Sequence, residues 1–258
     1  NCAFTTLDHW DKLPELLYIL MQGTGVGFSV EGKHIAKIPP VAVQGEERPS
    51  LWLVQDSTEG WCDAFKVGLE SWWRGADVQF SYVGIRPRGT PLKTKGGTAS
   101  GPEPLKQLLD YTRKMILNHQ GRNLSSLNMH DLACFCGSIV QVGGVRRAAE
   151  ISISDPSDEK MRHAKEGQFW LKAPERAMAN NTAVYDTKPS METFFREWES
   201  LMQSGSGERG IFNRGGYNHL QKPDRREAHP DFGLNPCGEI VLRPQQFCNL
   251  SIAVARRN

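Results

Sequence analysis

Apolar residues recur at intervals of three or four along several segments of the chain, as they do on the buried face of an amphipathic helix. The clearest stripe consists of Trp61, Phe65, Leu69 and Trp72, and we interpret it as core packing rather than as a cofactor site. By the same criterion, helices are predicted over residues 11–22, 56–73, 105–119, 127–141 and 191–203.

Strand patterns lie between these helices. Residues 76–85 alternate between apolar and polar types, and the segment 146–154 runs into a second strand. The stretch GTGVGFSVEG, residues 23–32, reads as a glycine-rich turn that leads into a short strand. Asp56 and Glu59 have the spacing of a helix-capping pair. Helices and strands that alternate in this way predict an α/β fold with parallel strands.

Composition narrows the class of protein. The 258 residues suffice for one large domain or two small ones. A formal net charge of +2 gives no electrostatic reason to expect a nucleic-acid partner. Apolar runs long enough to span a membrane and secretory signals are absent, so we expect a cytoplasmic protein with no membrane partner. Because the sequence starts at Asn1 and stops after VARRN, we expect it to be an internal piece of a longer protein.

Six cysteines are spread along the chain without the dense spacing of a secreted disulfide framework, which favours reduced thiols, some of them catalytic. Cys62, Cys134 and Cys136 are most simply small buried hydrophobic residues. A zinc site at His130, Cys134 and Cys136 is the weaker alternative, because Cys-x-Cys is not the usual ligand spacing. We therefore expect no metal site.

Two glycine-rich stretches and one basic loop invite a nucleotide-binding interpretation. GTGVG fits neither the dinucleotide fingerprint nor the P-loop, and a tight turn is as good an explanation as close approach to a ligand. VGGVRRAAE places Arg146 after two glycines, and the loop from Arg86 to Pro104 carries four basic side chains. Both suit a polyanionic ligand. From residue types alone, surface charge is the commoner explanation.

The segment NPCGEIVLRPQQFCNLS, residues 235–251, combines an amide, two thiols and a carboxylate. In an extended segment, Asn235, Cys237 and Glu239 would project to the same side. The carboxylate can act as a general base, the amide can donate and accept hydrogen bonds, and the thiol can give up a hydrogen. The structural alternative is that Cys237 is buried and that Asn235 caps a turn.

Taken in order, NCAF, MQGTGVGFS, RPRGTPLKTKGGTASGP, VGGVRRAAEI, MANNTAV, GIFNR and NPCGEI…FCNLS resemble the catalytic subunit of ribonucleotide reductases. The resemblance runs essentially end to end and is strongest to the adenosylcobalamin-dependent, triphosphate-reducing, monomeric kind. It implies that residues 1–258 are the first half of a ten-stranded α/β barrel, truncated at both ends, with Cys237 on a finger loop. Such a fragment is expected to be inactive alone.

The resemblance also implies roles for individual residues. Cys237 would carry the thiyl radical that removes the 3′ hydrogen of the ribose, Glu239 would be the base for the 3′ hydroxyl, and Asn235 would hydrogen-bond the sugar hydroxyls. Cys2 and Cys248 would be the dithiol that supplies the reducing equivalents and ends as a disulfide.

The resemblance implies further roles at the substrate and effector sites. Gly25 and Arg146 would contact the substrate, and Asp8 and Arg86 would lie near a deoxynucleotide effector. The implied cofactor is adenosylcobalamin, bound largely by residues outside this chain. The implied partners are a ribonucleoside triphosphate, the effector and a thioredoxin-type reductant, and the protein would be a monomer or homodimer.

Three other interpretations stay open on the sequence. The first is the large subunit of an oxygen-dependent ribonucleoside-diphosphate reductase, which needs a separate metal subunit. The second is a non-catalytic nucleotide-binding module, although the intact NCAF and NPCGEI stretches argue against a decayed site. The third is a binding protein stabilised by a permanent Cys2–Cys248 disulfide.

Overall fold

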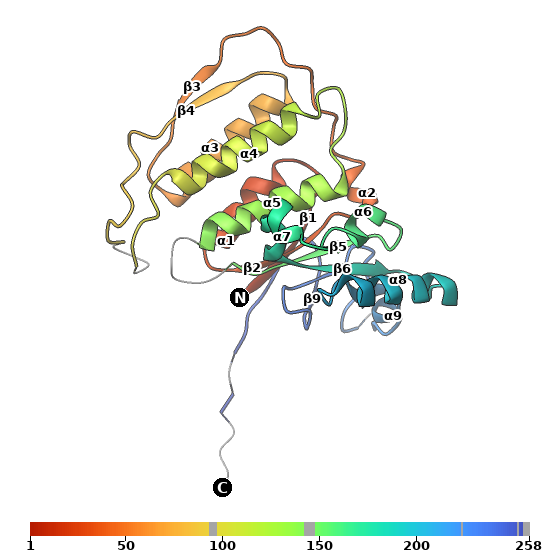
Figure 1. The fold of residues 1–258 in the computed structure, drawn as a ribbon. Helices are drawn as coiled ribbons and strands as arrows, with labels where there is room; N and C mark the ends of the chain where they lie inside the picture. The colour runs from red at the N-terminus through yellow and green to blue at the C-terminus, as the bar shows by residue number, and fades with distance from the viewer. Residues whose placement is uncertain (93–96, 142–147, 223, 252, 255–258) are drawn as a thin grey trace.

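A computed structural model of the chain describes residues 1–92, 97–141, 148–222, 224–251 and 253–254. Its centre is a sheet of six strands in these ranges, in the spatial order β10-β1-β2-β5-β6-β7 (Figure 1). Neighbouring strands from β1 to β7 are parallel, and β10 is antiparallel to β1. The strands are β1 (Cys2–Thr6), β2 (Gly25–Ser29), β5 (Glu150–Ser154), β6 (Ala179–Tyr185), β7 (Gly210–Asn213) and β10 (Gln246–Cys248).

The predicted helices are all present, displaced by a few residues at their ends. They are α1 (Lys12–Met21), α3 (Thr58–Trp73), α4 (Glu103–Leu117), α5 (Ser126–Gln141) and α8 (Met191–Ser204). Short helical turns form α2 (Gly32–Ile35), α6 (Glu159–Arg162), α7 (Phe169–Lys172), α9 (Arg214–His219) and the 3₁₀ turn η1 (Pro174–Met178). Two small sheets pair β3 (Ser50–Leu53) with β4 (Val78–Ser81), and β8 (Gly233–Leu234) with β9 (Val241–Leu242). Within the described residues, no helix is long and apolar enough to cross a bilayer.

The α/β class and the parallel strands are confirmed, whereas the main sheet of the described part has six strands and is not a closed ten-stranded barrel. Helices α1 and α5 cover one face of this sheet, and α3 and α4 pack on them as a further layer (Figure 1). The predicted core stripe is confirmed, since Phe65, Leu69 and Trp72 are almost fully buried.

The start of α3 differs from the predicted capping pair. The N-cap is Ser57, whose side-chain oxygen accepts a hydrogen bond from the backbone N–H of Gly60 at 2.9 Å. Asp56 instead accepts a hydrogen bond from Arg86 Nε at 2.6 Å. The acidic side chain therefore holds the basic loop against the start of α3.

The cysteines outside the proposed site behave as buried apolar residues, as predicted. Cys134 and Cys136 on α5 are fully buried, and burial raises the pKa of the Cys62 thiol to about 12. The ring nitrogens of His130 lie 3.1 Å from Asp131 Oδ1 and 2.9 Å from Asn181 Oδ1. His130 also lies 3.6 Å from Cys134 Sγ through its Nε2, so its ring is engaged by two oxygen partners and by this thiol.

Glycines let the β8–β9 hairpin lie directly on the second face of the sheet. The prediction of a glycine-rich turn before β2 is corrected, because Gly25 and Gly27 are inside the strand. A Cβ atom on Gly27 would lie 1.8 Å from the carbonyl oxygen of Leu234, and one on Gly233 would lie 2.0 Å from the ring of Phe4. The backbones can approach this closely only because both positions lack a side chain.

At the rim of the sheet, a buried guanidinium joins three elements. Arg214 is fully buried, and its Nη2 and Nε atoms lie 2.7 Å from Glu31 Oε1 and 2.6 Å from Asp186 Oδ1. Its Nη1 also donates to the carbonyl of Phe232, just before β8. Burial alone raises the pKa of the Glu31 carboxyl, but the hydrogen bonds and charge of Arg214 outweigh burial and hold it below its ordinary range.

The first prediction concerns Gly27→Ala. The added methyl group would meet the Leu234 carbonyl, so we expect the substitution to lower the free energy of unfolding by about 1–3 kcal/mol, as overpacking does. Urea unfolding followed by tryptophan fluorescence measures the loss. Gly45→Ala is the control, since its nearest neighbour would lie at an ordinary 3.6 Å. Equal effects of the two substitutions would contradict the close approach of the hairpin.

The second prediction concerns Arg214→Met. It leaves the Glu31 carboxylate buried without its main cation, and we expect a loss of about 3–5 kcal/mol in the free energy of unfolding at pH 7. The exposed pair Arg74–Glu70 provides the control, because Arg74→Met should lose no more than about 1 kcal/mol.

The wild type and Arg214→Met should also differ in how their free energy of unfolding depends on pH. In the wild type the pKa of Glu31 is lowered on folding, so its contribution to stability is present above the ordinary carboxyl pKa and is lost as the pH falls through the folded value. In Arg214→Met the buried Glu31 carboxyl has a pKa above its ordinary value. Acidification then neutralises it, so the loss of unfolding free energy caused by its buried charge becomes smaller. Unfolding curves between pH 4 and pH 7 test this difference, and parallel curves for the two proteins would refute it.

Candidate functional site

The β8–β9 hairpin carries the segment that the sequence singled out. Its two strands pair Gly233 with Leu242 and Leu234 with Val241, and the connecting residues 235–240 form the tip. The N–H of Gly238 donates to the carbonyl of Asn235 at 2.9 Å, and Gly238 has a left-handed φ of 81°. Residues 235–238 therefore form a turn.

This turn corrects the expectation of an extended segment with three side chains on one side. Cys237 and Glu239 are exposed at the tip, whereas Asn235 is fully buried beneath it. The alternative of a buried Cys237 is wrong, while the alternative of a turn held by Asn235 is confirmed. The exposed thiol and carboxylate are two residues apart and free to meet a ligand.

Asn235 fixes the hairpin tip through three hydrogen bonds. Its backbone N–H donates to the carbonyl of Ile240 at 3.0 Å, and its Oδ1 accepts from the N–H of Ile240 at 2.9 Å. Its Nδ2 donates to Cys2 Sγ on β1 at 3.7 Å. The side chain thus connects the two sides of the tip with the first strand of the sheet.

Cys2 and Cys248 lie opposite each other on antiparallel neighbours, β1 and β10. Residues paired in this way have Cα atoms about 4.5–5.5 Å apart, which lies within the range of about 4.4–6.8 Å that a disulfide needs. Both side chains are buried, and both thiols are free in the structure. Burial raises the pKa of the Cys2 thiol, the Asn235 amide opposes this rise, and the adjoining Cys248 adds to it.

Gly25 belongs to the same cluster. It is paired with Cys2 across β1 and β2, and a Cβ atom on it would lie 2.9 Å from Pro236 Cγ in the hairpin. Nothing in the sequence indicated that Pro236 would be buried against the sheet, although glycines at alternate strand positions are typical of a close backbone approach. The structure therefore assembles Cys2, Cys248, Gly25 and Asn235 under the hairpin.

The residues predicted to bind an effector lie elsewhere. Asp8 follows β1 and lies 3.8 Å from Lys37 Nζ, while Arg86 is held by Asp56. No hydrogen bond or ion pair connects Asp8 with Arg86 in the part of the chain that the structure describes. Arg146 falls outside the described residues.

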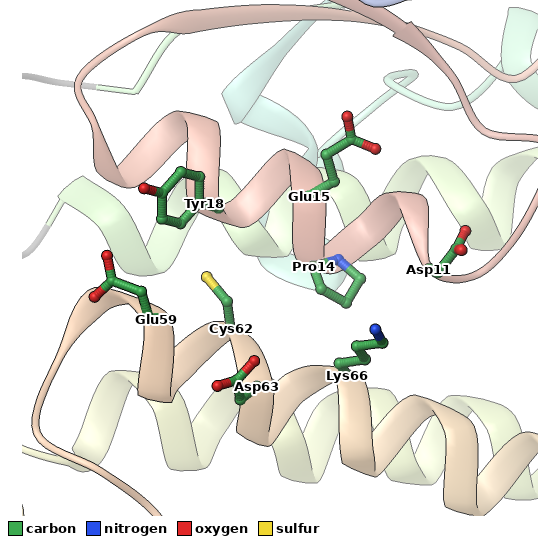
Figure 2. A pocket seen from close by; sticks show the side chains of 8 residues that line it. All are labelled: Asp11, Pro14, Glu15, Tyr18, Glu59, Cys62, Asp63 and Lys66. Atoms are coloured by element: carbon green, nitrogen blue, oxygen red, sulfur yellow. The ribbon is translucent and has the colours of Figure 1, made fainter.

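A separate cavity of about 300 Å³ opens between α1 and α3 (Figure 2). Four carboxylates on its wall would repel a triphosphate, so we do not assign the nucleotide to it. None of the hairpin residues contributes to it. Its lining consists of Asp11, Pro14, Glu15, Tyr18, Glu59, Cys62, Asp63 and Lys66.

The chemistry available at the hairpin follows from these positions. The buried thiols can release two electrons and two protons when a disulfide forms between them. The exposed Cys237 and Glu239 can exchange a hydrogen atom and a proton with a molecule placed over the tip. A reaction that couples an exposed thiol to a dithiol beneath it is therefore geometrically possible.

Comparison with known proteins gives a consistent picture. No model of a known protein family matches the chain. The adenosylcobalamin-dependent ribonucleoside-triphosphate reductase of Euglena gracilis is 30% identical over 260 residues, which cover 97% of this chain and 35% of that protein. The enzyme of the same name from Lacticaseibacillus paracasei is 29% identical over 275 residues, covering 90% of this chain and 36% of that protein.

A solved structure of a B12-dependent, class II ribonucleotide reductase has the same fold. It superimposes with a TM-score of 0.79 at 24% identity and covers 95% of this chain and 41% of its own. The chain thus spans about a third of the length of the curated relatives it matches. The resemblance found in the sequence motifs is confirmed: over nearly its whole length, the chain is homologous to a segment of the adenosylcobalamin-dependent ribonucleotide reductases.

Proposed function

We propose that the protein containing this chain reduces ribonucleoside triphosphates to 2′-deoxyribonucleoside triphosphates for DNA synthesis, with adenosylcobalamin and a cysteine dithiol. The observation that carries the proposal is the register of Cys2 opposite Cys248 beneath the hairpin that exposes Cys237. Its relatives are named for the same reaction. A thioredoxin-type protein would reduce the dithiol again after each turnover.

Each group at the site has a defined part in this reaction. Cys237, exposed at the tip, takes the 3′ hydrogen of the ribose as a thiyl radical and returns it at the end. Glu239 accepts the proton of the 3′ hydroxyl. Asn235 would hydrogen-bond the sugar hydroxyls through the second N–H of its amide, since the other amide groups are bonded to Ile240 and Cys2. The 2′ hydroxyl leaves as water, a C–H bond replaces the C–O bond, and Cys2 and Cys248 supply two electrons and two protons as they form their disulfide.

The cofactor meets this chain at the hairpin tip. Adenosylcobalamin, when bound, supplies the radical through homolysis of its cobalt–carbon bond. The tip fits that requirement, because Cys237 is exposed and a Cβ atom on Gly238 would meet nothing within 4 Å. We place the residues that hold the corrin ring in the part of the relatives that this chain does not span.

We further infer that residues 1–258 correspond to the first half of a ten-stranded barrel. The sheet is open, and helix α8 lies at one end of the molecule (Figure 1). This helix carries an apolar stripe that is about half or more exposed. An exposed stripe of this kind is normally covered by further protein. It consists of Met191, Phe195, Trp198 and Met202, which are 46–65% exposed.

Substrate and effector contacts complete the proposal. Gly25, next to Cys2, would line the substrate site together with Arg146, and the regions of Asp8 and Arg86 would serve the effector deoxynucleotide. Arg86 supports this only through its position, because its guanidinium is already hydrogen-bonded to Asp56. The relatives favour this reductase over the oxygen-dependent one that needs a metal subunit.

The third prediction concerns the dithiol. Mild oxidation of the full-length protein should link the Cys2 and Cys248 peptides, and millimolar dithiothreitol should reverse the link. Cys248→Ser should abolish it, and Cys237→Ser, the control, should leave it intact. Mass spectrometry of peptides digested without reduction reads out the pairing. A bond that resists the dithiol would favour a permanently stabilised binding protein, and a Cys237 cross-link would refute the pairing.

The fourth prediction concerns turnover by the full-length protein. Anaerobic, dithiol-dependent reduction of CTP should require adenosylcobalamin and no second protein. Cys237→Ser should reduce turnover to background while nucleotide binding stays near normal, because the exposed thiol carries the radical. Cys62→Ala, a substitution in the core of the same chain, should retain turnover. Repeated turnover by Cys237→Ser would exclude the radical role. No activity with or without cobalamin, while nucleotide binding stays intact, would favour the class that needs a metal subunit.

A further inference from the structure

The amide of Asn235 has only one orientation that satisfies its surroundings. Its Oδ1 accepts the backbone N–H of Ile240 at 2.9 Å, so the amide oxygen must face the hairpin. Flipping the amide would place an NH₂ group against that N–H donor and leave two donors facing each other. The opposite atom, Nδ2, is therefore directed at Cys2 Sγ, 3.7 Å away.

This orientation makes Cys2 Sγ a hydrogen-bond acceptor, so its own S–H points away from the amide. An N–H donor stabilises a thiolate much more than a neutral thiol, because hydrogen bonds to a charged group are the stronger ones. Asn235 is fully buried and held at both ends, so it faces the sulfur without having to be reoriented. Cys248 is paired with Cys2 across β1 and β10, and its sulfur forms no hydrogen bond with Asn235 among the described residues.

We propose that Asn235 is a positioning residue that stabilises the thiolate of Cys2, and so makes the two thiols of the pair unequal in acidity. This inference rests on the proposed function for its meaning, and it goes beyond the contact of Asn235 with the sugar. The hydrogen bond works against burial and against Cys248, both of which favour the neutral thiol.

The consequence for the reaction is a division of labour between the two cysteines. When the 2′ C–O bond breaks, the proton of the Cys2 thiol moves to the departing oxygen and water leaves. The negative charge stays on Cys2 Sγ, where the Asn235 N–H already faces it. The Cys248 thiol then gives its hydrogen atom to C2′. The remaining electron returns to the sugar as the S–S bond forms, so the pair supplies two electrons and two protons in total.

Few other groups could produce the same effect. Among the described residues, Cys248 on β10 is the titratable side chain that acts on Cys2, and the hairpin contributes the neutral amide of Asn235. Cys248 can be removed by substitution. The contribution of Asn235 can therefore be isolated.

The experiment uses full-length protein with Cys248→Ser, so that Cys2 titrates alone. Alkylation of Cys2 by iodoacetamide is followed from pH 6 to pH 11 by mass spectrometry of its peptide. Asn235→Ala removes the donor, and Asn235→Asp keeps an oxygen for the Ile240 N–H while replacing the donor with a carboxylate. Both substitutions should move the midpoint of Cys2 alkylation up by about one pH unit, so that alkylation below the midpoint slows about tenfold.

The matched control carries Cys2→Ser and follows Cys248 in the same Asn235 variants. Its midpoint should move by much less than that of Cys2. Unchanged Cys2 profiles in the Asp variant, or equal shifts for the two cysteines, would overturn the inference. If the Ala variant does not fold, the Asp variant still tests the inference, because it preserves the loop hydrogen bond. Its carboxylate also raises the Cys2 midpoint by charge, so an unchanged midpoint there would overturn the inference. The titration needs neither nucleotide nor cobalamin, so its failure is distinguishable from failure of the proposed reductase activity.

Discussion

The arrangement of the site depends on one steric constraint, the contact between the β8–β9 hairpin and strands β1 and β2. Gly27 and Gly233 leave no room for a Cβ atom, and Gly25 leaves little. A side chain at Gly27 or Gly233 would force the hairpin away from the sheet. Asn235 would then no longer reach Cys2, and Pro236 would no longer pack on Gly25.

A buried ion pair of Arg214 also fixes the base of the hairpin against the sheet. Arg214 connects the residues that follow β2 and β6 with the carbonyl of Phe232, directly before β8. The carboxylate of Glu31 and the guanidinium are both buried, so each depends on the other for its stability. The rim of the sheet thus fixes where the hairpin begins, and the glycines fix how closely it lies.

The sequence predicted the helices and the α/β class well, because the 3.6-residue apolar period is strong in α1, α3, α4, α5 and α8. It also identified the cysteines of the pair, although only through resemblance. It could not predict that residues 235–238 turn, because a tertiary contact decides this: Asn235 is buried on β1 and bonded to Ile240. For the same reason the glycines of β2 looked like a turn, since the hairpin that requires them lies more than 200 residues away in the sequence.

Two kinds of thiol therefore result from one local geometry. The tip residues are exposed because the turn at Gly238 lifts Cys237 and Glu239 off the sheet, while Asn235 and Pro236 remain buried. An exposed thiol can meet a radical and a ribose, whereas a buried dithiol can reduce only a partner that is placed over it. The turn separates these environments within three residues, and Asn235, which anchors the turn, is also the residue that touches Cys2. The position of the exposed thiol and the hydrogen bond to Cys2 are in this way set by the same side chain.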